Sequence, residues 1–264
     1  MLYNRSKLMK PLVARIKPAN GLSGVFHYVL LLVFPLLLFM LVRLDFIQLA
    51  YILVVLSKWR MLAVRPRFWL ANIRSNSVDM MVGFSTLVFM THTGSAGWQL
   101  VWALVYAAWL IFLKPGSSVF YTSLQAGVGF LFGLMAMFIA WSGISSYGLV
   151  LVTGLICYLV ARHFFDSFDE PYAKLLSYLW GYFGAALMWV LAHILIVYPH
   201  RSGIISQPMI FLLTIGVALA TVYYWDHFDK FARFARKEVL FISGSIVVIL
   251  LISLYYEGNH LLLR

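Results

Sequence analysis

The sequence predicts an all-α, polytopic integral membrane helix bundle, a single transmembrane domain over residues 1–264 with about nine transmembrane helices. Hydrophobic residues make up 63% of the chain and charged residues 11%, and the mean hydropathy is +0.90. These values lie outside the composition of soluble domains. The apolar residues form segments long enough to cross a bilayer, and the basic residues fall in alternate gaps between them. We therefore expect a core of packed helices surrounded by lipid.

A helix that crosses the hydrocarbon core needs about 20 apolar residues. By that measure the predicted spans lie near residues 24–42, 45–63, 78–93, 97–113, 118–140, 147–164, 173–197, 204–224 and 239–256. The second and third are the least regular, because the apolar run 46–56 is brief and polar residues interrupt 91–93. Omitting either span would place the basic residues at 230–237 outside, so the charge pattern supports both.

The positive charges predict a cytoplasmic N-terminus and an external C-terminus, since cytoplasmic loops carry the excess of Lys and Arg. This orientation places 17 of the 20 Lys and Arg inside, including those of the basic segment 1–23, and leaves Arg43, Arg201 and Arg264 outside. The first apolar run is too long for a signal peptide and no small-x-small cleavage site follows it, so we expect an uncleaved span. A bacterial inner membrane is the predicted location.

The basic face predicts contact with the anionic headgroups of the bilayer and no contact with nucleic acid, because the basic residues flank apolar spans and form no separate domain. Segment 64–77 combines basic and aromatic residues and is predicted to lie as a helix in the headgroup layer. The residues expected to contact lipid headgroups are Arg65, Arg67, Trp69, Arg233, Arg236 and Lys237.

Small residues four positions apart predict close contacts between helices, since they let two backbones approach in lipid. The pairs are Gly129 with Gly133, Gly181 with Ala185, and Gly216 with Ala220. Cys157 is the single cysteine and lies in an apolar run, so it is expected to be an inert packing residue.

Two turns predicted to be cytoplasmic share the pattern aromatic-Asp-x-Phe-Asp. It occurs at residues 165–169 after the sixth span and at 225–229 after the eighth. The match favours a parallel repeat of 147–200 and 207–257, related by an axis along the membrane normal. Chance similarity over five positions is the alternative.

The same two turns hold five of the nine acidic residues. Asp residues three positions apart on a helix point to one side, so carboxylates of two adjoining turns can bind Mg²⁺ or another divalent cation. Such an ion can neutralise a phosphate or diphosphate substrate. The candidate metal ligands are Asp166, Asp169, Asp226, Asp229 and His163.

A structural explanation accounts for these acids as well, and we favour it. Asp226 with Lys230 and Asp229 with Arg233 have the spacing of salt bridges on a helix. Acidic residues directly before Pro171 are typical of a helix start, where the helix dipole stabilises negative charge.

Few polar side chains lie inside the predicted spans, and each is a functional candidate because its burial in lipid is costly. His193 is a candidate proton carrier or substrate ligand, with a structural hydrogen bond to a neighbouring helix as the alternative. Gln125 and Gln207 are candidates to line a polar cavity or to bridge helices. Asp79 opens the third span on the inside, where Asn76 and Ser77 are expected to cap the helix.

No trusted enzyme signature occurs in the chain: there is no His-Glu-x-x-His, no Gly-x-Ser-x-Gly and no phosphate-binding Gly-Lys-Ser/Thr loop. We therefore expect a non-enzymatic membrane protein, either a permease-like carrier of a small solute or lipid, or a scaffold. The alternative is a lipid-modifying enzyme that uses the cytoplasmic Asp cluster to hold a divalent cation and a phosphorylated substrate. The oligomeric state is not predicted by the sequence.

Overall fold

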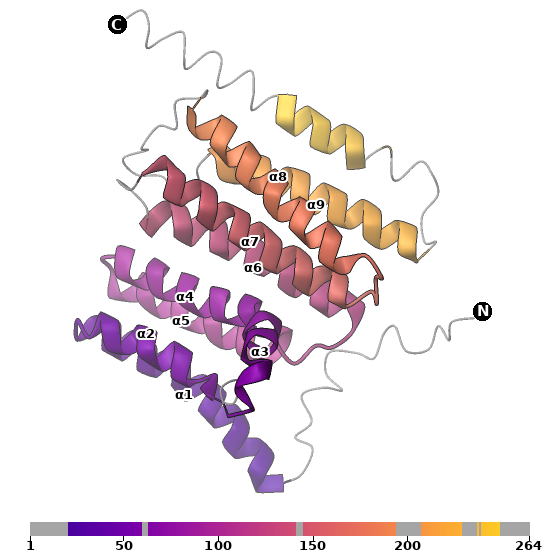
Figure 1. Cartoon of the computed structure of the whole chain (residues 1–264). Coiled ribbons are helices and arrows are strands. Elements are labelled where there is room, and N and C mark those ends of the chain that lie inside the picture. Colours follow the sequence, from indigo (N-terminus) through magenta and orange to yellow (C-terminus); the bar gives the residue numbers. More distant parts are fainter. Residues whose placement is uncertain are drawn as a thin grey trace, which may run out of the picture.

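The computed structural model describes residues 21–59, 63–140, 145–193, 207–228, 237 and 239–248, and within these ranges every regular element is a helix (Figure 1). The elements are α1 (Gly21–Arg43), α2 (Ile47–Leu56), the 3₁₀ turn Pro66–Phe68, α3 (Trp69–Ser75), α4 (Ser77–His92), α5 (Ala96–Ala108) with its π-helical end Trp109–Leu113, α6 (Val119–Ala140), α7 (Ser146–Asp166), α8 (Ala173–His193) and α9 (Gln207–His227). A shorter apolar helix follows at Val239–Val248.

Six of the described helices are long and apolar enough to cross a membrane: α1, α5 with its π-helical end, α6, α7, α8 and α9. The predicted number of nine spans is not confirmed. The 10 residues of α2 and the 16 of α4 reach about 15 and 24 Å at about 1.5 Å per residue, short of a hydrocarbon core of about 30 Å. The last predicted span, 239–256, is described as far as residue 248, and the orientation of the termini stays a prediction.

The helices lie side by side in near sequence order, from α1 and α2 at one edge through α8 and α9 to the helix Val239–Val248 at the other, with α6 between the two halves (Figure 1). The first half packs around a core that includes Leu38, Val54 and Tyr106. The second half packs around Phe130, Leu134 and Leu212. Because α6 borders both halves, its two sides meet different surroundings.

Helix α4 is enclosed by its neighbours, which explains how a short helix with polar residues is accommodated. Ser85 and Thr86 are buried, and the Thr86 hydroxyl donates to the Val82 carbonyl at 2.8 Å, so its polar group is satisfied within the helix. At Gly83 a Cβ atom would lie 2.9 Å from the Tyr106 hydroxyl. Small residues therefore allow α5 to approach α4 closely.

The contacts predicted for the small residues are confirmed. A Cβ atom at Gly129 would lie 2.7 Å from Val78 Cγ1, and one at Gly216 would lie 2.7 Å from Phe130 Cε1. On α8, Gly181 faces α7, where a Cβ atom would lie 3.1 Å from the Gly154 carbonyl oxygen. Gly184 packs directly on the buried Cys157 thiol, so the predicted packing role of Cys157 is confirmed too.

Candidate functional site

The two turns that share the aromatic-Asp-x-Phe-Asp pattern meet in the structure, but their aromatic residues make the contact. The Phe168 ring lies 5.0 Å from the His227 ring and 6.1 Å from the Phe228 ring, measured between centroids. Tyr223 packs edge-on against Phe165, at 5.2 Å. This aromatic cluster of Phe165, Phe168, Tyr223, His227 and Phe228 packs the end of α9 against the end of α7 and the turn that follows it.

The acidic residues of these turns have separate surroundings. Asp166 is paired with Arg162 one helical turn earlier, at 2.9 Å, and Asp169 adopts a left-handed backbone with φ of 53°. Glu170 accepts a hydrogen bond from the Tyr223 hydroxyl. Asp229 lies outside the described residues, and within the described ranges no three His, Cys, Asp or Glu side chains are grouped to hold a metal ion. The predicted metal site therefore stays a prediction.

His163, the fifth candidate ligand, is bound to Gln125 instead, at 3.1 Å between His163 Nε2 and Gln125 Oε1. The Gln125 amide nitrogen donates to the carbonyls of Leu113 at 2.7 Å and Gly116 at 2.9 Å. Gln125 thus joins α6 to the end of α5 and to α7. These contacts agree with the bridging alternative for Gln125.

His193 is exposed at the last residue of α8, where its ring stacks on Trp189 at 4.8 Å and its Nδ1 lies 2.8 Å from the Trp189 carbonyl. It lies at the opposite end of the bundle from Gln125, so these two candidates share no cavity. The side chain of Gln207 is outside the described part of the chain.

The residues predicted to contact headgroups lie on an exposed segment where they are described. Arg65, Arg67 and Trp69 are exposed around the 3₁₀ turn and α3, and the Arg67 guanidinium lies 4.6 Å from the centroid of the Phe68 ring. Lys237 is exposed as well, while Arg233 and Arg236 lie outside the described residues.

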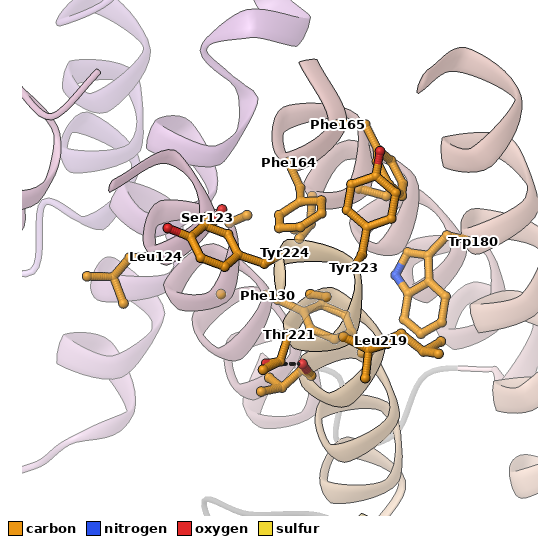
Figure 2. Close-up of a pocket in the computed structure, with 18 of the residues that line it drawn as sticks. Ser123, Leu124, Phe130, Phe164, Phe165, Trp180, Leu219, Thr221, Tyr223 and Tyr224 are labelled. Atoms are coloured by element: carbon orange, nitrogen blue, oxygen red, sulfur yellow. Dashed lines mark hydrogen bonds between the residues drawn. The ribbon is translucent and has the colours of Figure 1, made fainter. Parts of the chain in front are cut away.

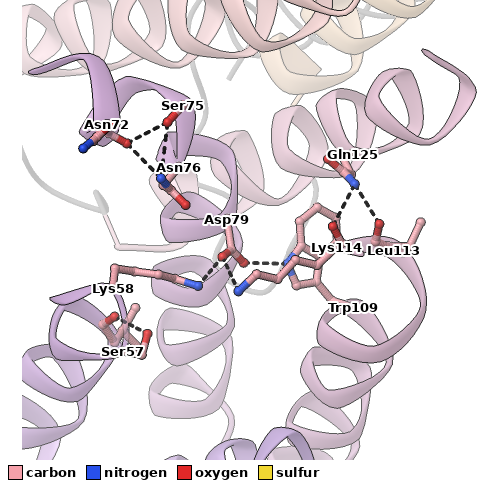
Figure 3. Close-up of polar contacts among 11 residues, drawn as sticks. Ser57, Lys58, Asn72, Ser75, Asn76, Asp79, Trp109, Leu113, Lys114 and Gln125 are labelled. Carbon is pink, nitrogen blue, oxygen red and sulfur yellow. Dashed lines mark hydrogen bonds and ion pairs between the residues drawn. The ribbon is translucent and has the colours of Figure 1, made fainter. Parts of the chain in front are cut away.

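A buried charged network that sequence reasoning missed lies at the end of the bundle that carries the 114–118 turn, which we name the charged end (Figure 3). The Asp79 carboxylate is paired with Lys58 and, at 2.8 Å, with Lys114, and it accepts a hydrogen bond from Trp109 Nε1 at 3.0 Å. Exposed fractions are 7% for the Lys58 side chain, 11% for Asp79 and 38% for Lys114. The expected capping of α4 is not seen, because Asn76 at its N-terminus makes no side-chain cap hydrogen bond and the Ser77 hydroxyl donates to the Arg74 carbonyl instead.

Three elements bring these side chains together. Lys58 follows the end of α2, Asp79 lies in the first turn of α4, and the π-helical turn after α5 places Trp109 and Lys114 beside them. Burial of a charge in a membrane protein is costly unless the charge is paired. Here the Asp79 carboxylate pairs with the ammonium groups of Lys58 and Lys114. The sequence does contain a signal, because Asp79 is the single acid between Asp45 and Asp166.

A second feature lies on the opposite side of α6, where an apolar groove of about 1250 Å³ runs between α6, α7, α8 and α9 (Figure 2). Its wall is rich in aromatic residues, and several lining residues, such as Leu179, Val217 and Leu219, are about half exposed on the outer surface of the bundle. The groove is therefore open laterally, on the outer surface of the bundle.

The end of the groove at the charged end carries its polar groups. Figure 2 shows the Tyr224 ring pointing toward α6, where Ser123 and Leu124 lie, and the Tyr223 ring pointing toward Phe165. Asp226 borders the groove at this end. The arrangement combines a long apolar wall with a few hydroxyl groups at one mouth.

Comparison of the chain with protein-family models, with curated proteins and with solved structures found no match. Its function is therefore inferred from the charges, contacts and cavities of the chain itself.

Proposed function

We propose that this chain is a non-enzymatic, lipid-handling membrane protein that accepts the hydrocarbon chain of a membrane lipid in the groove between α6, α7, α8 and α9. The observation that carries the proposal is the groove itself, about 1250 Å³, aromatic and open laterally. Drug-sized ligands occupy pockets of about 300–1,000 Å³. A larger, apolar and laterally open space suits a chain that enters from the bilayer.

A carrier of small polar solutes has less support. Such a function needs convergent polar groups within the membrane, whereas Gln125 is occupied by carbonyls and His163, and His193 is exposed at a helix end. The enzyme alternative needs Asp229 to join the acids of the other turn, and among the described acids Asp166 is bound to Arg162 and Glu170 to Tyr223.

The proposal includes the membrane location and the headgroup contacts that the sequence predicts. A bacterial inner membrane is the proposed location, with the exposed Arg65, Arg67 and Trp69 in contact with anionic headgroups. Lys237, also exposed, belongs to the same proposed surface.

Gly127 offers a direct test, because it lines the groove and a Cβ atom there would meet nothing within 4 Å. Gly127→Phe places an aromatic ring in the groove, and its Cβ atom has no neighbour to displace. Gly244→Phe is the matched control, since Gly244 also has no atom within 4 Å of a Cβ position and lies on another helix. Both substitutions replace glycine in a helix, which removes part of a cost of about 1 kcal/mol.

The measurement is quenching of tryptophan fluorescence by lipids with dibrominated acyl chains, in purified protein in nanodiscs. Trp180 lines the groove, so the difference between wild type and Trp180→Phe isolates its signal. We expect Gly127→Phe to reduce the quenching of Trp180 and Gly244→Phe to leave it unchanged. Equal quenching in all three proteins would show that lipid chains do not enter the groove.

A further inference from the structure

The Asp79 network contains more positive than negative charge. The ammonium groups of Lys58 and Lys114 contact the same carboxylate oxygen, Asp79 Oδ2, and reach it from two sides (Figure 3). Within the described part of the chain, Asp79 is the one acid that contacts either lysine. Two cations therefore share one anion, and one positive charge is left without a counterpart.

Hydrogen-bond donors are in excess as well. The other carboxylate oxygen, Asp79 Oδ1, accepts the indole N–H of Trp109 at 3.0 Å, so both oxygens of the carboxylate are occupied. A lysine ammonium carries three N–H donors and no acceptor. Lys58 and Lys114 together thus offer more donors than the carboxylate accepts. The network matches a ligand that brings negative charge and several acceptor oxygens.

Lys114 is the member of the network that a ligand can reach. Its side chain is 38% exposed, whereas that of Lys58 is 7% exposed and Trp109 is 3% exposed. The backbone around it is held by Gln125, whose amide nitrogen donates to the carbonyls of Leu113 and Gly116, on either side of Lys114. The accessible ammonium is therefore fixed in place before a ligand arrives, which lowers the cost of binding.

The surroundings of Lys114 fit the boundary between hydrocarbon and headgroups. Phe112, in the π-helical turn just before Lys114, is 45% exposed, and the chain turns back at the end of the bundle directly after Lys114. An exposed apolar ring next to a cation suits a position where one part of the surface contacts lipid chains and the next contacts their headgroups. A phosphate at this depth can reach Lys114 without entering the bundle.

We infer that Lys114, held by Asp79 beside Lys58, binds a phosphate group at the charged end of the bundle. An anionic phospholipid and a free phosphate share the chemistry that the site requires, which is acceptor oxygens on a negative charge. The site is independent of the proposed function, because neither lysine lines the groove.

The test is thermal unfolding of the purified protein in dodecyl maltoside micelles, with dioleoylphosphatidylglycerol or inorganic phosphate as the probe. A ligand that binds the folded protein raises the melting temperature as its concentration passes the dissociation constant. We expect Lys114→Gln to weaken the apparent affinity about tenfold, the effect of losing a hydrogen bond to a charged group. This variant should fold, because Asp79 keeps Lys58 as its partner.

Three variants serve as controls. Lys174→Gln removes the same charge from an exposed position near the start of α8, so it reports the general effect of surface charge. Lys114→Arg keeps the cation and should keep the stabilisation by the probe. Gly127→Phe, which acts in the groove, should keep it as well.

The outcomes identify the source of the phosphate or overturn the site. Stabilisation by phosphatidylglycerol that is lost in Lys114→Gln alone would support a lipid headgroup, and the same pattern with inorganic phosphate alone would support a free phosphate. Equal responses of Lys114→Gln and Lys174→Gln would overturn the site, because surface charge in general would then explain the effect. An equal effect of dioleoylglycerol, which has the same chains without phosphate, would assign the stabilisation to the groove and overturn the site too. Wild type that neither probe stabilises would overturn it as well, whether or not lipid chains enter the groove.

Discussion

The two sides of α6 are packed differently, closely on the side of α4 and with an open groove on the side of α9. Toward α4 the helix packs through Gly129 and Gly133, and the charged end is filled by the Asp79 network. Toward α9 it packs through Phe130 against Gly216, and an apolar groove of about 1250 Å³ remains beside this contact. Small residues thus close one side, whereas ring packing at one point leaves space on the other. Polar groups hold the closed side together, and the open side is available for an apolar ligand.

The largest expected effect is at Asp79. Replacing it with alanine leaves the Lys58 ammonium, which is 7% exposed, without its partner. Removal of one member of a buried ion pair costs about 3–5 kcal/mol. We expect a loss of this size in the free energy of unfolding, measured by titration with dodecyl sulfate in mixed micelles.

The control for Asp79 is Asp166→Ala, which breaks an i,i+4 pair whose carboxylate side chain is 45% exposed. Exposed pairs of this kind contribute about 0.3–0.5 kcal/mol, and because the Arg162 side chain is 15% exposed we expect a larger loss than that, but a smaller one than at Asp79. Equal losses for the two variants would contradict the view that Asp79 neutralises a buried cation.

A second comparison concerns two glycines, one in a tightly packed contact between helices and one that faces open space. A side chain at Gly184 overlaps the Cys157 thiol, whereas one at Gly127 meets open space in the groove. Insertion of extra atoms into a packed contact costs about 1–3 kcal/mol. We therefore expect Gly184→Leu to lower the melting temperature in detergent and Gly127→Leu to preserve or raise it. A lower melting temperature for Gly127→Leu would show that the groove is closed in solution.

Much of this fold could be predicted from sequence, because helices in lipid satisfy their own backbone and leave local signals. The contacts of Gly129, Gly181 and Gly216 followed from four-residue spacing. The lengths of the spans were harder to predict from the sequence. Because α4 is enclosed by other helices, its 16 residues need not match the thickness of the bilayer, and a count of apolar residues cannot detect that.

The site was harder to predict, because it depends on which helices become neighbours. Lys58 and Lys114 fitted the charge rule as residues facing the cytoplasm, and only the packing of α2, α4 and α5 shows that both bind Asp79. The paired turns illustrate the same limit. Their pattern placed them together, yet Phe168 makes the contact while Asp166 pairs within its own helix.

The smallest expected effect tests how the open side is held. The hydrogen bond from Tyr223 to Glu170 joins the end of α9 to the turn after α7, beside the mouth of the groove. Tyr223→Phe removes this bond and keeps the ring against Phe165, so the loss should be about 1 kcal/mol and local. We expect faster amide hydrogen exchange in the last turns of α9 and an unchanged rate in α4. Tyr182→Phe is the control, since Tyr182 is 76% exposed on α8 and should alter neither helix. An unchanged exchange rate in the last turns of α9 would mean that the aromatic cluster holds α9 without the hydrogen bond.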